Sequence, residues 1–195
     1  EMMRLPTFQF WAPSTVEEAA ARLAEAPADT MLVAGGTDLL PDMKRRQQVP
    51  KTIVALRQIE ALSRIHHNGG VTVGAAATLT AIVRDERLHA ACPGLWQAAA
   101  QVATPHLRNM GTVGGNLCLD TRCTYYDQTE DWRRAIGYCM KKDGGTCWVA
   151  TSSPRCLAVS STDTAPMLQA LGAHVRLVSA AGARTVTVAD LYDND

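Results

Sequence analysis

The sequence predicts an α+β protein, and three observations lead to this prediction. Apolar runs of four to six residues end at glycines or polar residues, which is typical of short buried strands. Segments between several of these runs carry apolar residues three and four positions apart, as amphipathic helices do. Near the C-terminus, two alternating runs flank an Ala-Gly turn, which predicts a β-hairpin. A chain of 195 residues, 47% of them hydrophobic, is long enough for one or two domains with a core.

In the first third of the chain, helix and strand signals alternate. The segment STVEEAAARLAEA begins with Ser14 and Thr15 and has glutamates three positions later, a capping-box pattern that predicts a helix start. Pro27 is expected to end this helix. Residues 31–34 and 52–56 are predicted strands, because both are short apolar runs bounded by turn residues. We expect the MKRRQQ stretch between them to be a solvated surface.

The rest of the chain continues the mixture of helices and strands, apart from one segment. Residues 120–155 follow neither the helical nor the strand period. A loop of that length inside a compact domain is either functional or disordered, and its aromatic residues and cysteines argue against disorder. The elements expected around it are a strand at 71–75, a helix from Thr78 to about His89, a helix opened by Pro93, a strand at 156–161, a helix from Asp163 through Leu171, and a hairpin of 174–179 with 184–188.

Charge and hydropathy exclude several classes of function. The formal net charge is zero, so global electrostatics do not support a nucleic-acid partner or an anionic membrane. The N-terminal segment lacks the apolar core of a signal peptide, and no run approaches the roughly 20 apolar residues that span a bilayer. We therefore expect a soluble, cytoplasmic protein. In that setting the six cysteines are expected to be reduced thiols, some of them metal ligands, rather than disulfides.

Two glycine loops are candidate ligand sites. VAGGTDLL places Gly35 and Gly36 directly after a predicted strand, where free backbone amides can cradle phosphate oxygens. The loop matches neither the dinucleotide fingerprint nor a P-loop, and Pro41 argues against a helix directly after it. A tight strand–loop turn is the alternative. GTVGGN at 111–116 is the second loop, and the two together are able to grip a pyrophosphate. Asp163 either accepts from a sugar hydroxyl or caps a helix.

Three motifs together carry a family resemblance. AGGTDLLP, ATPHLRNMGTVGGNL and SSTDTAPML occur in the order found in the flavin-carrying medium subunits of the molybdenum hydroxylases, which include xanthine dehydrogenases and carbon monoxide dehydrogenase. The resemblance implies a two-subdomain FAD-binding fold of the vanillyl-alcohol oxidase type, divided here into residues 1–57 and 58–195, without the C-terminal domain of the family. The FAD contacts that it implies are Val33, Ala34, Gly35, Gly36, Thr37, Asp38, Leu39, Thr104, Gly111, Thr112, Gly114, Gly115, Asn116 and Asp163.

The irregular segment holds four of the six cysteines, three of the four tyrosines and two of the four tryptophans. Cys123, Cys139, Cys147 and Cys156 are separated by 15, 7 and 8 residues. Four thiolates suit either a tetrahedral zinc ion or an iron–sulfur cluster, and the absence of any C-x-x-C pair leaves this choice open on spacing alone. Unligated thiols are a further alternative.

The resemblance narrows that choice. NLCLDTRCTYYDQ and the GYC element are similar to the flavin subunits of 4-hydroxybenzoyl-CoA reductases, which carry a 4Fe–4S cluster in an insert at this place. It implies that residues 120–156 form the insert, with Cys123, Cys139, Cys147 and Cys156 as the ligands. Cys118 is the alternative ligand, and Cys92 is expected to be a small structural residue.

The function implied by the resemblance is electron transfer in the degradation of aromatic compounds. A ferredoxin-like donor would reduce the 4Fe–4S cluster, and electrons would pass through FAD to 2Fe–2S clusters on a small subunit and to molybdenum on a large molybdopterin-binding subunit, in a dimer of heterotrimers. The chain offers no acid–base pair or nucleophile for the substrate. The alternatives are the flavin subunit of an oxidative molybdenum hydroxylase and a non-redox module stapled by zinc.

Overall fold

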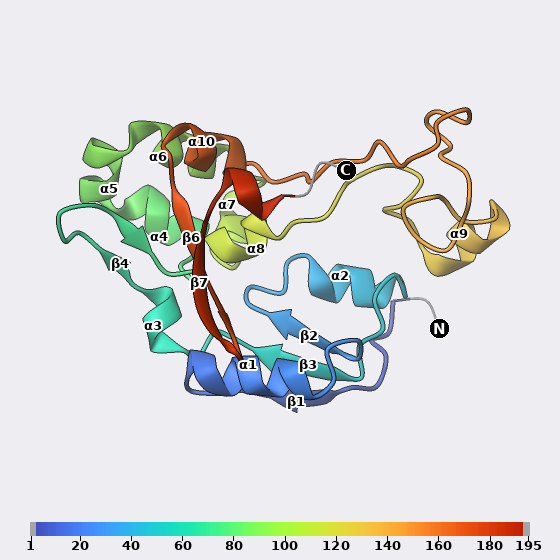
Figure 1. The fold of residues 1–195 in the computed structure, drawn as a ribbon, viewed down its shortest axis with the longest axis horizontal. Helices are drawn as coiled ribbons and strands as arrows, with labels where there is room; N and C mark the ends of the chain where they lie inside the picture. Colours follow the sequence, from blue (N-terminus) through green and yellow to red (C-terminus); the bar gives the residue numbers. More distant parts are fainter. Residues whose placement is uncertain (1–2, 193–195) are drawn as a thin grey trace.

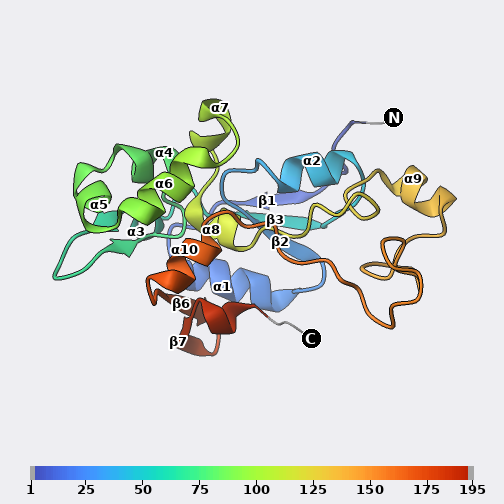
Figure 2. The same ribbon diagram turned by 90° about the horizontal axis from the view of Figure 1, so that it is seen from above.

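The computed structural model describes residues 3–192, and its first part is a small parallel sheet between two helices. The strands are β1 (Gln9–Trp11), β2 (Thr30–Val33) and β3 (Thr52–Ala55), with β3 in the centre and both neighbours parallel to it. Helices α1 (Val16–Glu25) and α2 (Leu39–Lys44) cover opposite sides of the sheet (Figures 1 and 2). A parallel sheet is normally buried on both faces, and this one follows the rule.

The central strand explains the two apolar layers. Successive side chains of a strand point to opposite faces, so Val54 packs with Ala19 of α1 while Ile53 packs with Met43 of α2. All four side chains are buried, and Val54 and Met43 are fully so. Helix α1 starts as the sequence predicts: Thr15 Oγ accepts from the amide of Glu18, and the Glu18 carboxylate accepts from the amide of Ser14.

The second part is mainly helical around a separate core. Helices α3 (Glu60–Ser63), α4 (Leu79–Arg84), α5 (Glu86–Ala91) and α6 (Pro93–Gln101) follow the sheet, together with the short strands β4 (Ile65–His66) and β5 (Thr72–Val73). Leu79, Ile82, Leu88 and Leu95 form the centre of the core. Later elements are α7 (Pro105–Arg108), α8 (Val113–Leu117), α9 (Glu130–Ala135), α10 (Ala165–Ala170), β6 (His174–Ser179), β7 (Gly182–Thr187) and the 3₁₀ turn η1 (Ala189–Leu191). The β6–β7 hairpin runs back from α10 to α1 (Figure 1).

The cysteine-rich segment, residues 120–156, projects beside α2 and away from the α4–α6 core (Figures 1 and 2). Its regular element is α9, capped by Thr129. The three apolar core clusters of the described residues contain no member of this segment. It is therefore ordered by something other than a hydrophobic core of its own.

Several predicted elements are confirmed and others need correction. The strands near 31–34 and 52–56, the helix opened by Pro93 and the C-terminal hairpin are present. The predicted helix from Thr78 is interrupted, because Asp85 ends α4 and caps α5. Residues 156–161 are extended but pair with no strand in the described chain, so that strand prediction is wrong.

Two predictions about the region after the first glycine loop are also wrong. Helix α2 does follow the loop directly, because Pro41 lies in its first turn, where a missing N–H costs no hydrogen bond. MKRRQQ is not a purely solvated surface, since Met43 and Gln47 are buried. Within residues 3–192, no helix is long and apolar enough to cross a membrane.

Candidate functional site

The two glycine loops are in direct contact. A Cβ atom added at Gly35 would collide with the backbone carbonyl oxygen of Met110, and the carbon Cα of Gly111 lies close to the same position. Thr37 of the first loop reaches to within 3.7 Å of a Cβ built on Gly111. Gly35 therefore allows the backbone of the second loop to approach a loop at the carboxyl end of β2, where parallel sheets bind ligands.

A hollow opens where these loops meet. It is lined by small side chains and a few polar ones: Ala34, Gly35, Arg57, Ser63, Ala76, Ala77, Thr78, Ala81, Asn109, Met110 and Thr112. Arg57 is the charged member of this lining, and its guanidinium donates to the Met110 sulfur at 3.7 Å, a weak acceptor. A positively charged, Ala-rich hollow of this kind suits an anionic ligand with a flat ring.

The backbone amides of the first loop are available to such a ligand. Gly35, Gly36 and Thr37 donate no amide hydrogen bond to any described part of the chain. In the second loop the amides are used internally: Val113 donates to Ala77 O at 3.0 Å, and Gly114 to Ala75 O at 2.9 Å. Three successive free amides fit phosphate oxygens, so the first loop has the donor set that a pyrophosphate needs.

The glycines of the second loop therefore serve close packing more than amide donation. A Cβ at Gly114 would meet the oxygen of Ala75 at 2.7 Å. Gly115 donates its amide to Thr112 Oγ at 3.1 Å, which caps α8, and Thr112 itself is buried. The loop holds its shape without help from a ligand.

Asn116, which is buried, and Asp163, which is exposed, are joined by a hydrogen-bond network. The Asn116 side-chain oxygen accepts from Thr162 Oγ, from the Thr164 amide and from Thr164 Oγ, at 2.7 to 3.0 Å. Its nitrogen donates to the Asp163 carboxylate at 3.0 Å. Asp163 does not cap α10, because Thr164 occupies the cap position. The carboxylate is instead oriented by Asn116 on the second loop.

The remaining flavin contacts implied by the sequence have mixed positions. Val33 ends β2, and Leu39 is buried in the core under α2, so Leu39 can offer a ligand its backbone only. Asp38 precedes α2 without capping it. Thr104 caps α7, is exposed and is not part of the hollow between the loops. The structure thus brings the two glycine loops together but does not bring Thr104 into that hollow.

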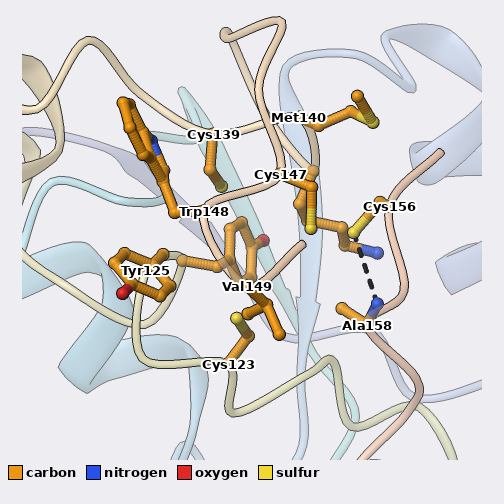
Figure 3. A pocket seen from close by; sticks show the side chains of 11 residues that line it. Cys123, Tyr125, Cys139, Met140, Cys147, Trp148, Val149, Cys156 and Ala158 are labelled. Atoms are coloured by element: carbon orange, nitrogen blue, oxygen red, sulfur yellow. Dashed lines mark hydrogen bonds between the residues drawn. The ribbon is translucent and has the colours of Figure 1, made fainter. Parts of the chain in front are cut away.

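A second hollow lies within the cysteine-rich segment, and all four predicted ligand cysteines line it. The thiols of Cys123, Cys139, Cys147 and Cys156 turn toward the same space (Figure 3). The other lining residues are Tyr125, Tyr126, Met140, Lys141, Trp148, Val149 and Ala158. All six cysteines are free thiols; Cys118, which is exposed, and Cys92, which packs against the α4–α6 core, do not line the hollow.

Backbone amides lie close to two of the four thiols, Cys147 and Cys156. Hydrogen bonding from the Ala150 amide lowers the pKa of Cys147; burial acts in the opposite direction, and the amides of Val149 and Leu157 add to the lowering. The Ala158 amide donates to Cys156 Sγ at 3.4 Å (Figure 3). Such amide donors stabilise negative charge on sulfur and are the usual partners of metal-bound thiolates.

Tyr126 closes the hollow on the side toward Asp120. The phenol is buried and donates to the Asp120 carboxylate at 2.8 Å. Burial, followed by that carboxylate, raises the pKa of Tyr126 to about 12, so the ring stays neutral at physiological pH. Lys141 pairs with the other Asp120 oxygen at 3.2 Å, which balances the carboxylate charge.

The four thiols that line this hollow are the donors used by two kinds of metal site. Among residues 3–192, no group of three or more His, Cys, Asp or Glu side chains is gathered closely enough to hold a single metal ion. A tetrahedral zinc site requires four sulfur atoms about 2.3 Å from one centre. An iron–sulfur cluster places its ligands farther apart because the cluster lies between them. Both kinds of site use four thiolates, so the four cysteines offer the donor set of either group.

Comparison with known proteins decides the family. A family model described as the FAD binding domain in molybdopterin dehydrogenase matches residues 6–195. The chain belongs to this family. Within this FAD-binding domain, the hollow between the glycine loops and the free amides of residues 35–37 form the part suited to the dinucleotide.

Relatives of the domain are subunits of several dehydrogenases. The medium chain of carbon monoxide dehydrogenase from Hydrogenophaga pseudoflava is 36% identical over 113 residues, which cover 57% of this chain and 39% of the relative. The aldehyde oxidoreductase FAD-binding subunit PaoB of Escherichia coli (strain K12) is 29% identical over 196 residues, covering 96% of this chain and 61% of the relative. The structure of quinoline 2-oxidoreductase from Pseudomonas putida 86 matches with a TM-score of 0.71 and 27% identity, covering 96% of this chain and 53% of that one. The chain spans less than two thirds of each of these relatives.

Sequence reasoning missed some residues of both hollows. Arg57 lines the hollow between the loops. The sequence signal for it was its position just after β3, which is parallel to β2, the strand that precedes Gly35. Met140 lines the cysteine hollow, next to Cys139. Arg122 and Asp127 contact the first part of the chain from the cysteine-rich segment, and no local pattern indicates those contacts.

Proposed function

We propose that this FAD-binding domain is an electron-transfer subunit of a molybdenum-dependent oxidoreductase, with a 4Fe–4S cluster held by Cys123, Cys139, Cys147 and Cys156. The observation that carries the proposal is the common hollow of these four thiols, which excludes Cys92 and Cys118. Amide donors near Cys147 and Cys156 support thiolate ligation. FAD would be bound with its pyrophosphate on the free amides of residues 35–37.

The cluster and the flavin would supply one-electron and two-electron chemistry, respectively. The chain's own residues bind, orient and shield these groups. Tyr125, Tyr126 and Trp148 cover the cysteine hollow and limit the access of water and oxygen. Asn116 fixes the direction of the Asp163 carboxylate for a hydroxyl of the bound dinucleotide. No residue of the chain is assigned to the chemistry of the substrate.

For the whole enzyme, we propose a 4-hydroxybenzoyl-CoA reductase that removes the phenolic hydroxyl to give benzoyl-CoA. Electrons would enter from a ferredoxin-like donor and leave toward a 2Fe–2S small subunit and a molybdopterin-binding large subunit, in a dimer of heterotrimers. The cysteine segment supports this choice, because a cluster beside the flavin loop provides an entry point for single electrons. The cytoplasm is the compartment where such reduced clusters persist.

A second candidate is an oxidative enzyme of the same group. The aldehyde oxidoreductase FAD-binding subunit matches over 96% of the chain, so the match extends into the cysteine-rich segment. The segment therefore does not belong to reductive enzymes alone. The four thiols would also suit a zinc-stapled module, which the iron and sulfide analysis distinguishes from a cluster.

The test is anaerobic purification followed by analysis of iron, acid-labile sulfide and the visible and electron paramagnetic resonance spectra. We expect about four iron atoms per chain and broad visible absorption that bleaches on reduction. Cys139→Ser should lose the iron, whereas Cys118→Ser should keep it, because Cys118 lies outside the hollow. A colourless protein without iron, or equal iron in both variants, would contradict the ligand assignment.

Activity of the complete enzyme separates the two candidates. Reduction of 4-hydroxybenzoyl-CoA by a reduced viologen is expected for the reductase. Oxidation of aromatic aldehydes by an artificial acceptor, without reductase activity, would favour the oxidative enzyme. Co-purifying subunits would identify the partners directly.

A further inference from the structure

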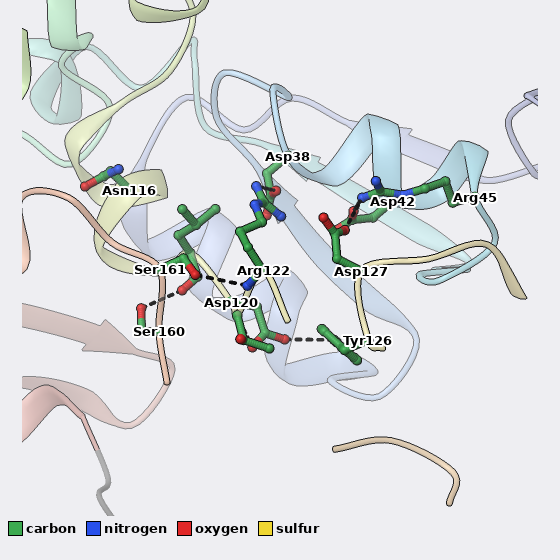
Figure 4. A network of polar contacts seen from close by, with 12 residues as sticks. Asp38, Asp42, Arg45, Asn116, Asp120, Arg122, Tyr126, Asp127, Ser160 and Ser161 are labelled. Carbon is green, nitrogen blue, oxygen red and sulfur yellow. Dashed lines mark hydrogen bonds and ion pairs between the residues drawn. The ribbon is translucent and has the colours of Figure 1, made fainter. Parts of the chain in front are cut away.

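The cysteine-rich segment is attached to the first glycine loop and α2 by polar contacts (Figure 4). Asp38, the residue between the loop and α2, forms an ion pair with Arg122, the residue directly before Cys123. The Asp38 side chain makes no capping bond to its own helix, so its carboxylate is committed to this pair. One residue of the glycine loop is thus held by a residue adjacent to a proposed cluster ligand.

Further contacts strengthen the attachment along α2. Arg45 at the end of the helix pairs with Asp127 at 2.7 Å, and its carbonyl oxygen accepts from the Glu130 amide at 3.0 Å. Lys142 Nζ donates to the backbone oxygen of the buried Gln47 at 2.6 Å. These contacts come from positions spread over the segment, and they join it to the residues at both ends of α2.

The order of the segment itself depends on its thiol site. Its buried residues are Thr121, Tyr126, Arg133, Cys139 and Cys147, none of them aliphatic. Fixing each residue costs about 1–2 kcal/mol of conformational entropy, and a hydrogen bond returns only about 1 kcal/mol net. A segment of this composition needs a cross-link such as a metal cluster to stay ordered.

We propose that the cysteine-rich segment positions the first glycine loop through Arg122, so that filling of the four-thiol site and binding of FAD reinforce each other. The inference rests on the proposed cluster and FAD sites. With the site filled, the segment is ordered and Arg122 holds Asp38, which keeps the loop in the shape that presents the amides of residues 35–37. With the site empty, the segment loosens, the pair is lost, and the loop must be ordered by FAD alone.

The test measures FAD affinity by flavin fluorescence on the same anaerobic wild-type preparation before and after iron removal. We expect removal of iron to weaken FAD binding by about five-fold or more, the usual lower range of coupling between two sites. Coupling is reciprocal, so saturating FAD should raise the chelator concentration that releases half of the iron by the same factor. Reciprocity holds for any coupling between the two sites, so variants are needed to show that the coupling runs through Arg122.

Variants locate the coupling at Arg122. Arg122→Met should weaken FAD binding by about two- to five-fold in the iron-loaded protein, as expected for a partly exposed ion pair, and should reduce the effect of iron removal. Arg122→Lys should restore part of both. Arg155→Met is the matched control, because Arg155 is an exposed arginine of the same segment and has no ion pair in the described chain.

The outcomes distinguish this inference from the function on which it rests. Wild-type protein without iron or without FAD would overturn both. Iron and FAD both bound, with equal FAD affinity before and after iron removal, would overturn the coupling alone. A loss in Arg155→Met as large as in Arg122→Met would also overturn it, since the effect would then follow the charge of the segment and not the pair with Asp38.

Discussion

We expect Asn116 to contribute more to the stability of the fold than any other polar residue of the second loop. Its side chain makes four hydrogen bonds that join α8 to the segment 162–164. The change Asn116→Ala removes all four while leaving the backbone of the loop unaltered. The side chain is about 7% exposed, so water cannot easily replace it.

The expected loss follows from the groups left without a partner. Thr164 is fully buried, and both its amide and its hydroxyl lose their acceptor. Each buried unsatisfied group costs about 1–3 kcal/mol, while the more exposed Thr162 and Asp163 can turn to water. Two such groups give an expected fall in the free energy of unfolding of about 2–6 kcal/mol. This is a large part of the total stability of a domain of this size, which is about 5–15 kcal/mol.

The assay is urea unfolding followed by circular dichroism, with Asn68→Ala as the control. Asn68 is exposed, and no hydrogen bond from its side chain is found in the described chain, so its replacement should change stability by less than about 0.5 kcal/mol. FAD binding should also weaken in Asn116→Ala, because Asp163 loses the group that orients it. A loss below about 1 kcal/mol for Asn116→Ala would refute the hydrogen-bond account.

Two further predictions concern charge. Arg57→Gln should weaken the binding of FAD and ADP but not that of riboflavin, because the guanidinium in the hollow between the loops is expected to face the phosphates. Titration calorimetry at two salt concentrations checks this prediction. An equal loss of affinity for riboflavin would contradict it. The hydrogen bond from His67 holds the pKa of Asp85 below its ordinary value of 3.8. A lowered carboxyl pKa gives stability that is present above 3.8 and is lost as the pH falls through the folded-state pKa. The difference in unfolding free energy between wild type and Asp85→Asn should therefore shrink as the pH is lowered toward about 3, and a constant difference would argue against it.

Local signals in the sequence predict the elements that are stabilised by residues close together in the chain. Thr15 and Glu18 form the capping interaction that the sequence indicates, and the alternating runs near the C-terminus do form a hairpin. The strand β1 is short and carries exposed aromatic residues, so its pairing with β3 depends on a partner about forty residues away and leaves no periodic pattern. The strand prediction at 156–161 fails for the opposite reason: an apolar run is present, but no strand lies beside it.

Some features of the candidate sites can likewise be predicted from local sequence, whereas others depend on the tertiary structure. The glycines at 35 and 111 are visible as motifs, and their contact follows from the sheet edge at which the first loop lies. One hollow is lined by all four cysteines, at positions 123, 139, 147 and 156, and this depends on the tertiary structure. The spacing of the cysteines in the sequence does not show it, and it does not distinguish zinc from a cluster. The pair of Arg122 with Asp38 joins positions 84 residues apart, and charges in sequence carry no information about such partners.

At the centre of the cysteine-rich segment lies an arginine where a globular core would have an aliphatic residue. Arg133 is fully buried, its guanidinium lies 5.6 Å from the Tyr126 ring centroid and 5.3 Å from that of Tyr138, and it donates to the Lys142 oxygen at 2.7 Å. The carboxylates of Glu130 and Asp143, at 3.7 and 3.6 Å, offset its charge. Apolar contacts are non-directional, whereas these hydrogen bonds and ring contacts are directional, and they hold the turn of residues 139–143 in one orientation. A polar centre therefore suits the proposed role of the segment, in which the direction of a thiol such as Cys139 is important, because it specifies geometry even though it adds little to stability.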